Sequence, residues 1–176
     1  MEAQEVLQFW FKELEPKDWF IKSDALDEEI NRRFSKIHQA AIAGELSHWR
    51  NTIQGRLAEI IVLDQFSRNL YRNDARAFLY DGMALVLAQE ALPYSEELTV
   101  IERSFLYMPF MHSESLAIHQ EAEKLFSEPG MEKRAKYEKM HREIIEQFGR
   151  YPHRNEILGR KSTEKELEFL RNHSEF

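Results

Sequence analysis

The sequence predicts an all-α fold in one domain, residues 1–176, and three observations support this prediction. Only six glycines and five prolines occur, and the apolar residues recur three or four positions apart, which is the period of an amphipathic helix. No segment shows the alternation of apolar and polar residues that is typical of a half-buried strand. Apolar residues make up 43% of the chain, which is ample material for one core. We therefore expect about eight helices and no sheet.

The N-terminal half contains four of these helices. A first helix over residues 3–14 ends before Pro16, because proline inside a helix removes a hydrogen bond and clashes with the preceding turn. A second ends at Gly44, since glycine suits the left-handed position after a helix. A third covers residues 52–66 and has a wide apolar face. Asp74 can cap the fourth helix.

Capping signals mark the helices that follow. Thr99 and Glu102 have the spacing of a capping box, in which each side chain accepts a hydrogen bond from a free backbone N–H. The helix that they open should end before Pro109. Ser113 can cap the next helix, which we expect to end near Phe126.

The C-terminal part combines two helices with one irregular segment. A long helix is expected over residues 132–148, and Thr163 and Glu166 form a second capping box that opens the terminal helix. Between them lies the segment 148–161. Its aromatic residues, proline and glycines predict an ordered loop rather than a helix.

Composition excludes several classes of function. A formal net charge of −7 argues against nonspecific electrostatic binding to nucleic acid. The absence of cysteine excludes disulfides and thiolate chemistry and fits a reducing compartment. The longest apolar runs, residues 60–63 and 83–88, are far below the roughly 20 residues that span a bilayer. We expect a soluble cytoplasmic protein with no membrane contact and no cofactor.

Three longer segments together resemble one family. They are LDQFSRN at residues 63–69, ERSFLYMPFMHSE at residues 102–114 and FGRYPHRN at residues 148–155. In this order they resemble the bacterial family known as domain of unknown function 924, over nearly the whole chain. The resemblance implies antiparallel helix pairs in a tetratricopeptide-like array, although the signature of the roughly 34-residue repeat is absent. Ser67 stands where the family usually has proline, and no catalytic residue is carried over.

Polar residues gather in two segments that we expect to form one ligand site. Arginine side chains match carboxylate or phosphate oxygens with two parallel hydrogen bonds, and the segment 147–163 has a local charge of +3. We therefore expect a binding module that presents arginines on a concave helical face to a small anionic or peptide ligand. The structural alternative is that Asp64 pairs with one of these arginines and fixes the loop to the helices. The candidate residues are Asp64, Gln65, Arg68 and Asn69 at the end of the third helix, and Arg150, His153, Arg154, Asn155 and Arg160 in the loop.

Two other functions remain open. A small hydrolase-like enzyme could use His112, Glu114 or His153 as acid or base. A structural scaffold would instead contact a partner through an exposed apolar patch. A metal site is not expected, because His119 lies about 10 Å along a helix from His112 and no His-x-x-x-His or cysteine pair occurs.

Overall fold

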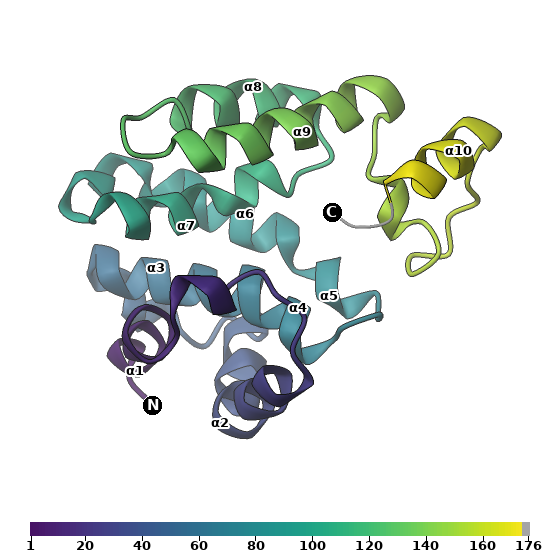
Figure 1. Ribbon diagram of the computed structural model, residues 1–176. Helices are drawn as coiled ribbons and strands as arrows, with labels where there is room; N and C mark the ends of the chain where they lie inside the picture. The colour runs from purple at the N-terminus through teal and green to yellow at the C-terminus, as the bar shows by residue number, and fades with distance from the viewer. Residues whose placement is uncertain (174–176) are drawn as a thin grey trace.

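The computed structural model describes residues 1–173. This part of the chain consists of helices joined by turns and loops and contains no strand (Figure 1). Eight of the α-helical segments there have six or more residues, in agreement with the predicted number. None of the helices in the described residues is both long and apolar enough to cross a membrane. The segments are α1 (Ala3–Gln8), α2 (Asp24–Ile42), α3 (Ile53–Ile61), α4 (Ser67–Leu70), α5 (Arg76–Leu79), α6 (Asp81–Ala91), α7 (Val100–Met111), α8 (Leu116–Leu125), α9 (Glu132–Phe148) and α10 (Glu164–Asn172).

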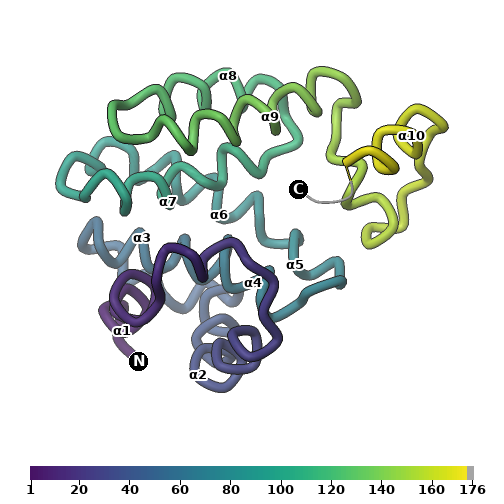
Figure 2. Tube along the Cα trace, in the orientation of Figure 1, coloured from purple at the N-terminus to yellow at the C-terminus, as the bar shows by residue number. Residues whose placement is uncertain are grey.

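The helices are stacked in layers (Figure 2). Helix α3 packs against α1, α6 and α7, and α7 packs in turn against α8 and α9. Helices α8 and α9 lie side by side at the far side of the stack from α1 and α2. Helix α10 lies to one side, against the 3-10 turn Pro152–Arg154. The tetratricopeptide-like character of this stack stays a prediction.

Aromatic side chains fill the centre of the stack. The Trp10 ring meets Phe66 and Phe105 edge-on, with ring centroids 5.8 and 5.6 Å apart. All three side chains are buried. Trp10 lies in the π-helical turn after α1, Phe66 in the one after α3, and Phe105 in α7. Their packing therefore connects segments that are distant in the sequence.

The predicted caps are present at several helix ends. Thr99 with Glu102 and Thr163 with Glu166 form complete capping boxes. Gly44 has a positive φ of 74° where the chain leaves α2. Serine at position 67 has the backbone N–H that proline lacks, and the chain stays helical beyond α3, since α4 begins at Ser67. The Ser67 hydroxyl donates to the Leu63 carbonyl.

The predicted end of α7 is wrong, because the helix continues through Pro109 to Met111. Proline in a helix costs about 3 kcal/mol. The following residues Phe110 and Met111 are fully buried, and each such side chain contributes about 1.5–3 kcal/mol. Burial therefore outweighs the lost hydrogen bond.

Two further predicted boundaries are wrong. The helix after Asp74 is divided at Tyr80 into α5 and α6. In an unbroken helix the Ala77 carbonyl would accept from the residue four positions later, but here it accepts from Arg68. Ser115, not Ser113, caps α8, because the Ser113 carbonyl accepts from His119 and residue 113 stays outside the helix.

Candidate functional site

A cleft of about 310 Å³ lies between α5, α6, the end of α7 and the segment that follows α9. Its size is within the range of small-molecule sites. Its walls are mostly apolar, and a few charged or hydrogen-bonding groups interrupt them. The apolar lining consists of Ala75, Phe78, Leu79, Gly82, Leu85, Pro109 and Leu158, and the polar lining of Asp81, His112, Ser113, Glu114 and Arg154.

Asp64 lies directly behind this cleft in a π-helical turn, Val62–Phe66. Such turns interrupt α-helices mostly as single turns and frequently at functional sites. The Asp64 carboxylate is 1% exposed and lies 2.7 Å from Nδ1 of His112. The Gln65 side chain donates to its second oxygen at 3.1 Å. Burial opposes ionisation of Asp64, but His112 and Arg68 more than compensate, so the pKa of this carboxyl lies below its usual value.

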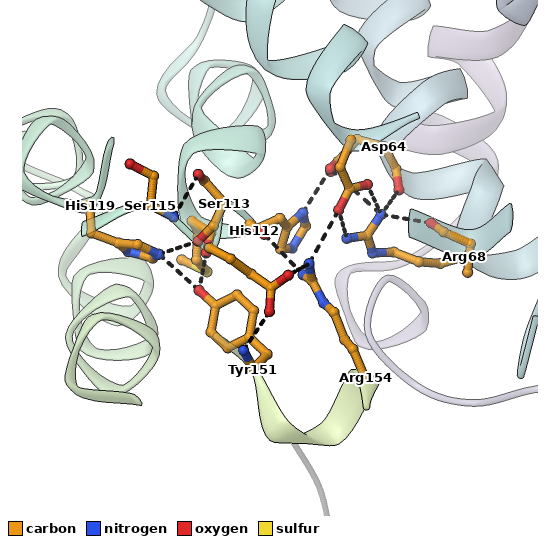
Figure 3. A network of polar contacts seen from close by, with 12 residues as sticks. Asp64, Arg68, His112, Ser113, Ser115, His119, Tyr151 and Arg154 are labelled. Atoms are coloured by element: carbon orange, nitrogen blue, oxygen red, sulfur yellow. Dashed lines mark hydrogen bonds and ion pairs between the residues drawn. The ribbon is translucent and has the colours of Figure 1, made fainter. Parts of the chain in front are cut away.

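The Asp64 contact determines the tautomer of His112. An ionised carboxylate only accepts hydrogen bonds, so Nδ1 of His112 carries a proton and donates to it. The second ring nitrogen, Nε2, has no hydrogen-bond partner within residues 1–173, and the side chain lines the cleft. In the neutral imidazole the Nε2 lone pair is therefore available to a molecule in the cleft. Figure 3 shows the contact between His112 and Asp64.

Arg68 is committed to internal contacts. Its guanidinium donates two hydrogen bonds to Asp81, at 2.7 and 2.9 Å, and others to the carbonyls of Asp64 and Ala77. Burial lowers the pKa of Arg68, but Asp81 and Asp64 raise it further than burial lowers it. Arg68 thus connects α4, α5 and α6 and has little capacity for a ligand.

Arg154 differs from Arg68, Arg150 and Arg160, because no carboxylate lies at hydrogen-bonding distance from it. Its nearest carboxylate oxygens are those of Asp81 at 3.7 Å and Glu114 at 3.9 Å, both beyond hydrogen-bonding distance. It donates to the His112 carbonyl at 2.9 Å and lies over the Phe78 ring. Its side chain is only 12% exposed. Burial lowers the pKa of Arg154, and the nearby Arg68 cation lowers it further.

Glu114 anchors the loop after α9. Its carboxylate accepts two hydrogen bonds from Arg160, at 2.9 and 3.0 Å, and one from the Tyr151 backbone N–H at 2.6 Å. Burial raises the pKa of Glu114, but these donors lower it below its usual value overall. Asn155 joins this anchor, since its side-chain oxygen accepts from Arg160.

Three predicted site residues lie elsewhere. Asn69 donates to Asp27 of α2, and Arg150 forms two hydrogen bonds with Glu166 of α10. His153 contacts the His173 carbonyl through Nε2. The structure therefore brings together Asp64, Gln65, Arg68, Arg154, Asn155 and Arg160 with His112 and Glu114, which the sequence analysis had treated as a separate hypothesis.

Sequence reasoning missed Asp81 and Tyr151. Asp81 follows the helix break at Tyr80, and the Asp81–Gly82 pair beside that break is a turn signal that could have indicated it. The Tyr151 hydroxyl donates to the Met111 carbonyl and lies 2.9 Å from Nε2 of His119. Within residues 1–173, no group of three or more histidine, aspartate or glutamate side chains is placed to hold a metal ion.

Comparison with known proteins places the chain in a family. The family described as "Bacterial protein of unknown function (DUF924)" matches residues 6–174. The structure of a protein of unknown function, ATU0120 from Agrobacterium tumefaciens, is similar with a TM-score of 0.92 and 36% sequence identity, over 97% of each chain. No curated protein matches. The chain belongs to the DUF924 family of bacterial proteins of unknown function.

Proposed function

We propose that the cleft binds a small molecule with an apolar body and one anionic head group, and that Arg154 contacts the anion. The observation that supports this most is the position of Arg154. Its guanidinium, on a side chain that is 12% exposed, lies at the cleft wall without a carboxylate at hydrogen-bonding distance. Buried charges are usually paired, so an anion in the cleft would supply the contact that the protein supplies only at long range.

The ion pairs of the other charged side chains at the cleft also support an anion site at Arg154. Asp81 is paired with Arg68, and Glu114 with Arg160. These two carboxylates therefore repel an incoming anion less than unpaired ones would. The apolar walls, such as Phe78 and Leu85, would contact the remainder of the ligand. We also propose a cytoplasmic location, which fits the absence of cysteine.

Ligand titrations of matched arginine variants test the proposal. Butyrate and inorganic phosphate are used as probes, and binding is followed by ¹H–¹⁵N chemical shifts of residues around the cleft. R154Q is expected to weaken binding by at least about tenfold, because a hydrogen bond to a charged group contributes about 1.5–3 kcal/mol. Comparing the two probes shows whether the site prefers a carboxylate or a phosphate.

R150Q is the matched control, since Arg150 pairs with Glu166 and does not line the cleft. This variant should bind the probes like the wild-type protein. If neither probe changes the chemical shifts around the cleft, there is no ligand site at Arg154. Equal weakening of probe binding in R154Q and R150Q would also contradict the proposal.

A further inference from the structure

His112 and Asp64 have the geometry of a general base held by a buried carboxylate. The Asp64 carboxylate oxygen lies 2.7 Å from Nδ1 of His112. It therefore fixes the proton on Nδ1 and leaves the Nε2 lone pair pointing away from the carboxylate. Asp64 would also stabilise the positive charge that forms when Nε2 takes up a second proton. In serine hydrolases a buried aspartate orients the catalytic histidine in the same way.

Arg154 adds a cation at the same wall of the cleft. Its Nη2 donates to the backbone carbonyl of His112, and the side chains of both residues line the cleft. A cation that is fixed beside a carbonyl oxygen stabilises the negative charge that develops on this oxygen during acyl transfer. The cleft thus places a base and an oxyanion-stabilising group together.

The remaining polar groups do not supply a protein nucleophile. The Ser113 hydroxyl accepts from the Ser115 backbone N–H and has no hydrogen bond to His112. Both oxygens of Glu114 accept hydrogen bonds from Arg160. Water is then the nucleophile that is left for the base to activate.

We infer that this cleft hydrolyses small carboxylic esters, with His112 as general base and Arg154 at the carbonyl oxygen. The inference rests on the proposed function, because the anion that Arg154 binds is then the carboxylate product. The substrate class is an ester with a short apolar acyl chain, in keeping with the apolar walls and the cleft volume of about 310 Å³.

The chemical step balances without a further reactant. A water oxygen forms a bond to the ester carbonyl carbon, and Nε2 of His112 takes the water proton. The carbonyl electron pair moves to its oxygen, next to Arg154. This pair then returns, the bond to the alkoxy oxygen breaks, and the imidazolium gives its proton to the departing alcohol. The products are one carboxylic acid and one alcohol.

Hydrolysis of p-nitrophenyl butyrate, followed by release of p-nitrophenol, tests the inference. The wild-type protein should exceed the rate in buffer alone. H112Q should lose about 100-fold of the catalysed rate, the lower range for a general base, and D64N should also lose most of it because the tautomer is no longer fixed. H48Q is the control, since His48 is exposed on the turn Ser47–Asn51, and its rate should equal that of the wild type.

The outcomes separate this inference from the proposed function. A wild-type rate equal to buffer, or a full rate in H112Q, overturns ester hydrolysis. If butyrate still binds the wild type but not R154Q, the ligand site stands and only hydrolysis fails. If hydrolysis depends on His112 but butyrate does not bind, the anion-binding proposal fails instead.

Discussion

Two histidines of similar chemistry, seven residues apart, occupy opposite situations in this protein. In each, Nδ1 lies 2.7 Å from a carboxylate oxygen that is 1% exposed: Asp64 for His112 and Glu138 for His119. The difference lies at the other ring nitrogen. Nε2 of His112 belongs to a side chain that lines a cleft, whereas Nε2 of His119 contacts the Ser113 carbonyl at 2.6 Å and the Tyr151 hydroxyl at 2.9 Å.

The hydrogen bonds at Nε2 determine whether each histidine can exchange a proton. A carbonyl only accepts, and the Tyr151 hydroxyl already donates to the Met111 carbonyl, so Nε2 of His119 must be the donor to both. The His119 side chain is fully buried and joins α8 to α9 and to the segment after α9. The proton on its Nε2 cannot leave without breaking these contacts. A histidine paired with a carboxylate through Nδ1 can therefore transfer a proton only where its Nε2 is accessible from a cavity.

The largest expected effect is the loss of stability in H119A. Removing one partner of a buried pair costs about 3–5 kcal/mol, because the other partner is left without compensation. Urea unfolding should show this decrease in the free energy of unfolding relative to wild type. A decrease below about 1 kcal/mol, the size of an ordinary hydrogen bond, would mean that the His119 contacts do not hold the three segments together.

Glu166 and Glu138 should make the free energy of unfolding depend on pH in opposite directions. Hydrogen bonds from Arg150 lower the pKa of Glu166 to about 2, so its contribution is present above the unfolded value of about 4.3 and is lost as pH falls toward 2. Burial raises the pKa of Glu138. Glu138 therefore contributes fully to the free energy of unfolding below its pKa in the unfolded chain, and this contribution is lost as pH rises through its pKa in the folded protein.

Thermal unfolding across pH distinguishes these two carboxyl groups. E166Q should be less acid-sensitive than wild type between about pH 4.3 and pH 2, while E138Q should lose the decline that wild type shows as pH rises above that range. R150Q should behave like E166Q. If E166Q and E138Q shift the profile in the same direction, the assigned environments of the two carboxyls are incorrect.

The smallest expected effect on stability is that of H112Q. Glutamine can still donate to Asp64, and His112 lies at the cleft wall, so the free energy of unfolding should change by less than about 1 kcal/mol. Urea unfolding in parallel with H119A gives a direct comparison. A loss in H112Q as large as that in H119A would mean that both pairs are structural.

The helices could be predicted because their signals are local. Apolar spacing and the two capping boxes are read within a few residues, and both boxes are present. The end of α7 could not be predicted, since burial of Phe110 and Met111 overrides Pro109. The division at Tyr80 also depends on a distant residue, because Arg68 takes the Ala77 carbonyl.

The candidate site was predictable in location more than in pairing. The sequence indicated that the segment at residues 63–69 and the loop at residues 148–161 could meet, and Arg154 does approach Asp81 and Glu114 next to Asp64. The structural alternative paired Asp64 with an arginine. Its hydrogen-bond partner at 2.7 Å is His112, and the nearest Arg68 nitrogen lies 3.9 Å away. The π-helical turn at residues 62–66 sets where Asp64 points, and its position depends on packing that the sequence pattern does not encode.

The most direct test of the contrast between the two histidines is a measurement of their ring tautomers by long-range ¹H–¹⁵N NMR in mildly alkaline solution. The hydrogen bonds predict that His112 is protonated at Nδ1 and unprotonated at Nε2, whereas His119 keeps the proton on Nε2. A protonated Nε2 in neutral His112, or an unprotonated Nε2 in His119, would contradict the assignment of one pair to the cleft and the other to the core.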